Sequence, residues 1–134
     1  MTGIFMMKLA EIQPSQLFIS SEKLSQVMED FSPITPGSLP PVPVKELRGK
    51  TVFTDGHTRA LAAFMSGLSE VRVFRDEDDM DWEAYEVCVD WCETEGIHTI
   101  ADLQNRIVSP AEYERLWLKR CAEMHNQLEA RRDH

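Results

Sequence analysis

The chain has 134 residues, of which 43% are hydrophobic, and a formal net charge of −9 at pH 7. This length and apolar content suit one domain with a hydrophobic core and leave no room for a second full domain. Binding to the backbone of double-stranded DNA requires clustered basic residues. Residues 76–95 instead contain ten acidic residues and no basic one, so the composition argues against that function.

The first third of the chain is expected to contain one helix and a long loop. The spacing of Leu24, Val27 and Met28 predicts a helix, and Ser21 is expected to cap it. Residues 32–43 contain five prolines and one glycine, which predicts a surface loop that enters an extended edge segment. The apolar stretch 4–7 is too short for a signal-peptide core and has no basic leader, which favours a cytoplasmic location.

Residues 50–74 are predicted to form a strand, a tight turn, a helix and a second strand. Residues 51–54 are β-branched or aromatic, and Gly56 supplies the turn. Residues 60–65 favour a helix that Gly67 ends, and residues 71–74 are again typical of a strand. The unit is at the short end of the range for a crossover connection.

The turn before this helix is a candidate anion site. The first turn of a helix leaves backbone N–H groups unpaired and carries the positive end of the macrodipole. Arg59 lies in that turn, and its guanidinium can hold two phosphate oxygens at once. Asp55 is expected to cap the helix, and His57 is the residue of the turn suited to proton transfer near neutral pH.

The C-terminal part is predicted to contain three helices. The first begins at Asp81, the second covers residues 99–106 with Asp102 at its cap, and the third begins at Ser109. Apolar side chains are expected to face inward from the first and third helices: Trp82, Tyr85, Cys88, Val89, Cys92, Tyr113, Leu116, Trp117, Met124 and Leu128. The three cysteines indicate no disulfide framework, and no metal site is expected.

The segment 39–79 resembles the ParB/sulfiredoxin-like domain. The resemblance rests on the run Leu-Pro-Pro-Val-Pro-Val, then Thr-Asp-Gly-His-Thr-Arg-Ala-Leu-Ala-Ala, then Val-Arg-Val-Phe. Residues 9–15 are similar to the first strand and turn of these domains. The resemblance implies an α+β fold with a small mixed sheet and a strand-turn-helix phosphate loop. Residues 1–80 would form this core, and residues 81–134 a helical C-terminal extension packed on it within one structural domain.

The resemblance also implies a site. Members of the superfamily hold nucleotide phosphates with a Gly-x-x-Arg element at a helix start, which places Gly56, Thr58 and Arg59 at the phosphate and His57 in the same loop. Sulfiredoxin has a reactive cysteine where this chain has His57, so sulfinic acid reduction is not expected. The partition protein that hydrolyses CTP has two arginines after the glycine, and this chain has Arg59 alone.

Three functions therefore follow as expectations. The first is binding of a nucleotide, CTP or ATP with Mg, or of another phosphate-bearing ligand, in plasmid, phage or chromosome maintenance. The second is a nuclease or nucleotide hydrolase with His57 as base and Asp55 as metal ligand or orienting group. The third is a non-enzymatic adaptor that binds a protein partner. No membrane association and no binding to double-stranded DNA are expected, whereas a homodimer is compatible with the apolar last helix.

Overall fold

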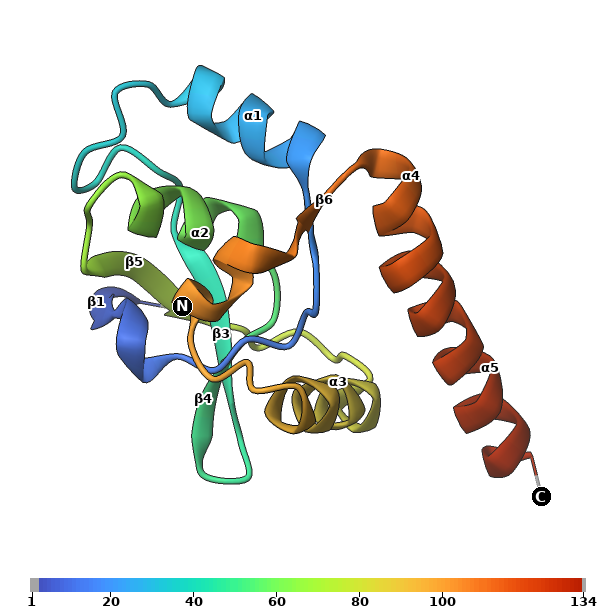
Figure 1. Ribbon diagram of the computed structural model, residues 1–134. Helices are drawn as coiled ribbons and strands as arrows, with labels where there is room; N and C mark the ends of the chain where they lie inside the picture. The colour runs from blue at the N-terminus through green and yellow to red at the C-terminus, as the bar shows by residue number, and fades with distance from the viewer. Residues whose placement is uncertain (1–2, 134) are drawn as a thin grey trace.

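The computed structural model describes residues 3–133, and its centre is a four-stranded mixed sheet (Figure 1). The strands are β1 (Ile4–Lys8), β3 (Val42–Leu47), β4 (Lys50–Phe53) and β5 (Glu70–Arg75). They lie in the order β1-β5-β3-β4, and β3 and β5 pair in parallel while the other two neighbouring pairs are antiparallel. The predicted α+β class with a small mixed sheet is confirmed.

Helices surround this sheet and continue beyond it. The α-helices are α1 (Ser21–Asp30), α2 (His57–Met65), α3 (Trp82–Thr94), α4 (Pro110–Tyr113) and α5 (Lys119–Arg132). Two short 3-10 helices are η1 (Leu9–Glu11) and η2 (Ile100–Arg106), and a π-helical turn, η3 (Glu114–Leu118), joins α4 to α5. A two-stranded parallel sheet is formed by β2 (Ile19–Ser20) and β6 (Ile107–Val108).

The order of the strands corrects one prediction about residues 50–74. The strands β4 and β5 flank α2 in sequence, but β3 lies between them in the sheet and β4 runs antiparallel to β3. The parallel crossover therefore joins β3 to β5, and it contains both β4 and α2. A two-residue turn at Arg48 and Gly49 closes the β3–β4 hairpin, and both residues have positive φ angles.

Two predicted boundaries near the N-terminus are also wrong. The first strand is Ile4–Lys8 rather than residues 9–15, where a 3-10 turn is followed by an extended segment that meets β4 at one bridge, between Gln13 and Val52. The cap of α1 is Ser20, whose Oγ accepts a hydrogen bond from the Lys23 N–H at 3.5 Å, so Ser21 is the first residue of the helix.

One apolar cluster joins both halves of the chain. It contains β3 and β5 valines, the buried alanines of α2, and residues of the last helices such as Trp117 and Leu128. A smaller cluster of Leu47, Val52 and Val89 packs α3 against the β3–β4 hairpin. Small side chains on α2 let α1 and η2 approach it closely, because alanine adds little bulk at a helix contact.

The last helix begins where the sequence predicts. Ser109 Oγ accepts a hydrogen bond from the Glu112 N–H at 3.2 Å, and the Glu112 carboxylate accepts one from the Ser109 N–H at 3.4 Å. The ring centroids of Trp117 and Trp91 lie 6.1 Å apart at an edge-on angle of 82°. Of the residues predicted to face inward from the two helices, Trp82, Tyr85 and Leu116 are half-buried, and the others are buried.

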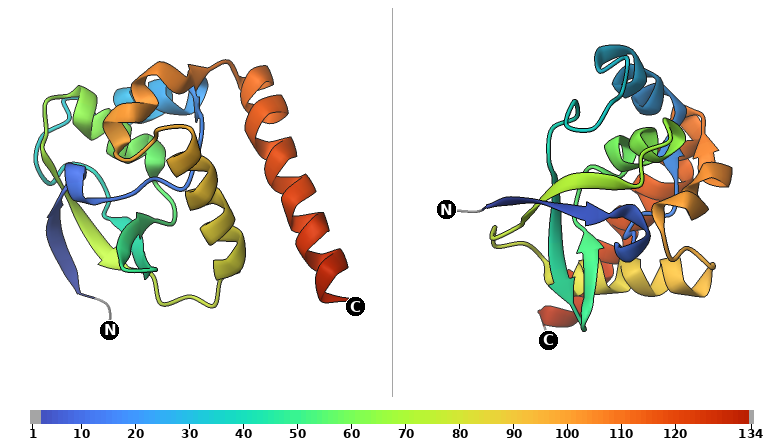
Figure 2. Two further views of the ribbon diagram at one scale, coloured as in Figure 1. Left: turned by 60° about the horizontal axis from the view of Figure 1, so that its bottom comes forward. Right: turned by 90° about the vertical axis from the view of Figure 1, so that its left-hand side faces the viewer.

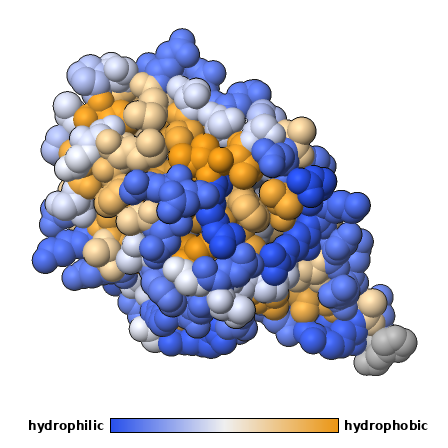
Figure 3. Space-filling model, viewed as in Figure 1, coloured by the Kyte–Doolittle hydropathy of each residue, from blue (hydrophilic) through white to orange (hydrophobic). Residues whose placement is uncertain are grey.

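The last helix runs beside α3 along one side of the core (Figures 1 and 2). The face seen in Figure 3 is mixed, with an apolar area over the centre of the core and hydrophilic residues around the C-terminal helix. None of the helices within residues 3–133 combines the length and the apolar character that crossing a bilayer requires.

Candidate functional site

The turn between β4 and α2 depends on a glycine at position 56. Gly56 has φ +73°, in the left-handed region that side chains disfavour. A Cβ atom at this position would lie 2.8 Å from Arg59 Nη2 and 2.8 Å from Val42 Cγ1. Val42 is buried in the core, so it cannot move aside at low cost. Both the backbone angle and the space therefore require glycine.

Arg59 folds back over this glycine. Its Nη1 donates a hydrogen bond to the Pro41 carbonyl at 2.9 Å and a longer one to the Pro40 carbonyl at 3.4 Å. The guanidinium thus ties the proline-rich loop to the start of α2. It is half-buried, and it has further N–H groups beyond those that the two carbonyls use.

The carboxylate of Asp55 bonds to the next amide in the chain. Asp55 Oδ1 accepts a hydrogen bond from the Gly56 N–H at 2.8 Å. The prediction that Asp55 caps the helix is wrong, because the N-cap residue is Gly56, which has no side chain to accept a bond. The reason is geometric: the left-handed glycine turns the chain between the carboxylate and the first turn of the helix.

The backbone N–H groups in the first turn of α2 therefore receive no side-chain cap. The first bond within the helix runs from the Ala60 N–H to the Gly56 carbonyl at 3.0 Å. The N–H groups of His57, Thr58 and Arg59 precede it and have no partner inside the helix. Together with the helix dipole, three such amides favour an anion at this end of α2.

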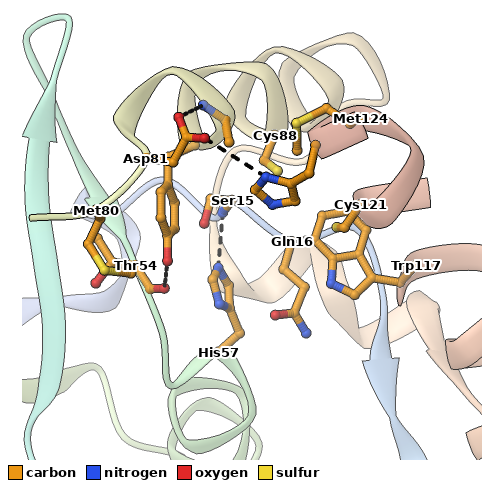
Figure 4. Close-up of a pocket in the computed structure, with 13 residues that line it drawn as sticks. Ser15, Gln16, Thr54, His57, Met80, Asp81, Cys88, Trp117, Cys121 and Met124 are labelled. Carbon is orange, nitrogen blue, oxygen red and sulfur yellow. Dashed lines mark hydrogen bonds and ion pairs between the residues drawn. The ribbon is translucent and has the colours of Figure 1, made fainter. Parts of the chain in front are cut away.

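His57 is the first residue of α2, and its side chain is buried. Its Nε2 accepts a hydrogen bond from the Ser15 N–H at 2.9 Å (Figure 4). The ring also packs against Phe53, with centroids 5.5 Å apart. Burial lowers the pKa of His57 from 6.5 to about 4, although the nearby Asp55 carboxylate acts in the opposite direction. The imidazole is therefore neutral at pH 7.

The bond from Ser15 also fixes which nitrogen of His57 carries the proton. A neutral imidazole has one donor and one acceptor nitrogen, and Nε2 is the acceptor here. Nδ1 consequently carries the hydrogen. Within the described residues, Nδ1 is buried and has no hydrogen-bond partner. A buried donor without a partner costs about 1 to 3 kcal/mol of folding free energy. An acceptor that formed a hydrogen bond with Nδ1–H would remove this cost.

These residues line one cavity of about 370 Å³, which we call the α2 cavity. All four residues predicted to bind a phosphate, Gly56, His57, Thr58 and Arg59, line it, and so does Asp55. The structure therefore brings together every site residue that the sequence predicted, although it gives Asp55 and His57 different hydrogen-bonding roles from those expected.

Six further residues of the α2 cavity were missed by the sequence analysis. They are Gln16, Lys23, Gln26, Val27, Phe31 and Tyr113. Lys23 Nζ lies 5.2 Å from the centroid of the Tyr113 ring, so a cation and an aromatic face border the same space. No local motif marks these residues, because they come from segments distant from residue 56 in the sequence.

His57 also borders a second cavity, of about 320 Å³, on the side of α3 and α5 (Figure 4). We call it the α3–α5 cavity. Its walls include Tyr85 and Cys88 from α3 and Trp117 and Cys121 from the last helices. His57 and Gln16 line both cavities.

Acidic residues near the site do not form a metal centre by themselves. Buried Asp76 accepts a hydrogen bond from the Thr54 hydroxyl at 2.8 Å and another from the Asp78 N–H at 3.0 Å. Across residues 3–133, no three side chains of His, Cys, Asp or Glu are arranged to hold an ion.

Comparisons with known proteins bear on the fold. No protein-family model matches the chain, and no curated protein sequence matches it. The structure is similar to that of protein Atu1540 from Agrobacterium tumefaciens, with 12% sequence identity and a TM-score of 0.52 over 77% of this chain and 62% of that one. A further match is sulfiredoxin from Arabidopsis thaliana, with 20% identity and a TM-score of 0.49 over 65% of this chain and 97% of that one.

These similarities concern the fold alone. This chain spans 62% of the length of Atu1540, and the identity is too low to carry over an activity. The similarity to Atu1540 supports the α+β fold class that the sequence resemblance implied.

Proposed function

We propose, from the resemblance of residues 39–79 to the ParB/sulfiredoxin-like domain and from the geometry of the turn, that the chain binds a phosphate-bearing ligand, a nucleotide, in the α2 cavity. The observation that carries the proposal is the open first turn of α2 in the wall of the α2 cavity, which begins at His57, a residue whose buried Nδ1–H has no partner among the described residues. A buried donor, three free amides and the positive end of a helix all favour an acceptor of negative charge at one place.

The charges and shape of the α2 cavity support a ligand of this class. Lys23 and Arg59 line its walls and would offset phosphate charge, and Tyr113 offers an aromatic face to a nucleobase. A volume of about 370 Å³ is within the usual range for small-molecule sites. The Asp55 carboxylate fits a Mg²⁺ ion that arrives with the phosphates, since Mg²⁺ is commonly held by one or two carboxylates plus substrate oxygens.

The hydrogen bonds of His57 favour nucleotide binding over nucleotide hydrolysis with His57 as the general base. A general base needs a free lone pair within reach of the proton that it removes. The Nε2 lone pair already accepts the Ser15 N–H, and Nδ1 carries a hydrogen. We therefore propose that His57 acts as a hydrogen-bond donor to the ligand. Incubation with CTP and ATP in the presence of Mg²⁺ should release no phosphate above the buffer rate.

Isothermal titration calorimetry with CTP, ATP and a nucleoside monophosphate tests the binding. We expect saturable heat for at least one of them, and roughly threefold to tenfold weaker binding in Lys23→Gln, because a cation at the cavity wall is lost. Lys8→Gln is the matched control, since it removes the same charge from the exposed end of β1. Absence of heat for all three nucleotides, or equal weakening in both variants, would contradict the proposal.

A role in plasmid, phage or chromosome maintenance is a proposal that rests on the resemblance. A cytoplasmic location is a separate proposal. A homodimer or another protein partner is likewise proposed, with the last helix as the candidate surface.

A further inference from the structure

The loop between α1 and β3, residues 32–41, is held by two arginine side chains from other elements (Figure 1). Arg59 on α2 binds the last two carbonyls of the loop. Arg72 on β5 binds carbonyls just before them: its Nη2 donates a hydrogen bond to the Leu39 carbonyl at 2.6 Å and another to the Gly37 carbonyl at 3.0 Å. The two arginines therefore hold neighbouring parts of one short segment.

The segment between these two attachments is stiff. Leu39 is buried, and it is followed directly by Pro40 and Pro41. A proline ring fixes its own φ angle at about −65°, and it also confines the residue before it to extended angles. Through this stiff segment, the carbonyl that Arg72 holds sets the positions of the two proline carbonyls that Arg59 binds.

Packing within the sheet does not account for an arginine at position 72. The side chain is half-buried, and the acceptors of its Nη2 are neutral carbonyls. Its Nε is buried and has no hydrogen-bond partner within residues 3–133. A buried donor without a partner costs free energy that an apolar side chain of similar size would avoid. The arginine is therefore explained by the loop that it holds.

Arg59 divides its guanidinium between the loop and the start of α2. Its Nη1 donates to the proline carbonyls, at 2.9 Å for Pro41. Its Nη2 lies on the side of Gly56, since a Cβ atom at that residue would be 2.8 Å from this nitrogen. Nη2 is therefore next to the residue from which the open first turn of α2 begins. It can donate to a phosphate at that turn while Nη1 stays bound to the loop.

We propose that Arg72 is a positioning residue for Arg59, and through it for the anion site of the α2 cavity. The inference rests on the proposed function, because it concerns the affinity of that site for a phosphate-bearing ligand. Arg72 itself lies outside the described wall of the cavity. It holds the loop, the loop orients the Arg59 guanidinium, and Arg59 meets the ligand with its side chain already ordered. Immobilising a long side chain is part of the free-energy cost of binding, and this arrangement removes it from the binding step.

Isothermal titration with CTP and ATP in the presence of Mg²⁺ measures the effect. Arg72→Gln should weaken binding about threefold to tenfold, because the ligand must then order Arg59. Arg75→Gln is the matched control: it removes the same charge from the exposed end of the same strand, and it should change the affinity by less than about twofold. Equal weakening in both variants would overturn the proposal.

A double-variant cycle separates positioning from a general structural defect. In an Arg59→Gln background, Arg72→Gln should weaken binding no further, because the residue through which it acts is gone. A structural defect would weaken binding by the same factor in both backgrounds, and that result would count against the positioning role.

NMR of the arginine guanidinium groups tests the positioning without any ligand. In the wild type, the Nη signals of Arg59 and Arg72 should show slow rotation of the guanidinium, because both groups donate hydrogen bonds to the loop. Arg72→Gln should make the rotation at Arg59 fast, whereas Arg75→Gln should leave it slow. Fast rotation at either Arg59 or Arg72 in the wild type would overturn the proposal even if Arg72→Gln fails to fold.

The two experiments distinguish failure of the proposed function from failure of this inference. If no nucleotide binds while Arg72→Gln still releases Arg59, the proposed function fails and the positioning of Arg59 by Arg72 stands. If a nucleotide binds equally well to Arg72→Gln and to the wild type, or if the rotation at Arg59 is the same in both, the proposed function stands and the positioning role is overturned.

Discussion

Mild acid should destabilise the fold through His57. The pKa of this side chain is about 4 in the native state and about 6.5 when unfolded, because burial disfavours its charged form. The unfolded state therefore binds more protons in this interval. The stabilisation is fully present above pH 6.5 and is lost as the pH falls from 6.5 toward 4.

The magnitude follows from the difference between the two pKa values. A difference of about 2.5 pKa units corresponds to about 3 kcal/mol in the free energy of unfolding, of which about 2 kcal/mol is lost between pH 7.5 and pH 5. The structural reason is that protonation of Nε2 removes the acceptor of the Ser15 N–H and places a charge in the core. Carboxylate titration adds to the effect below about pH 5.

The assay is urea unfolding of the wild type and of His57→Gln at the two pH values. Glutamine offers an amide oxygen at a reach similar to that of Nε2 and does not titrate, so it retains an acceptor for Ser15. We expect the wild type to lose about 2 kcal/mol more than the variant between pH 7.5 and pH 5. Equal losses in both proteins would refute the argument that His57 is buried and neutral.

Three further substitutions test the turn and the last helix. Gly56→Ala should destabilise the fold by about 2 to 4 kcal/mol in urea unfolding, because it combines a left-handed φ with overpacking. Gly49→Ala has a similar φ and open space around it, so it should cost only about 1 kcal/mol, and equal costs would argue against the close contact at Gly56. Ser109→Ala removes a helix cap and should cost about 1 kcal/mol, a value that a change below about 0.3 kcal/mol would contradict.

Features that local chemistry determines could be predicted from the sequence. The Ser109 capping box, the start of α3 at Asp81 and the glycine turn at Gly56 each depend on residues within four positions of one another. The resemblance to a known fold added the candidate loop, and the structure places its four predicted residues, Gly56, His57, Thr58 and Arg59, at one cavity.

Features that depend on distant contacts could not be predicted. The acceptor role of His57 depends on the Ser15 amide, 42 residues away, and the insertion of β3 between β4 and β5 depends on sheet pairing. Lys23 and Tyr113 reach the α2 cavity only because α1 and α4 pack near α2. Asp55 was misassigned because a left-handed Gly56 and an ordinary turn residue have the same sequence signature at a helix start.

The central claim is that Nδ1 of His57 is a donor beside free amides, ready for a negatively charged ligand. The most direct test is ¹⁵N NMR of the imidazole and of the His57, Thr58 and Arg59 amides during titration with CTP and Mg²⁺. The free protein should show a protonated Nδ1 and an unprotonated Nε2, and the Nδ1 and amide signals should shift together and saturate. A protonated Nε2, or signals that stay unchanged while nucleotide is in excess, would contradict the account.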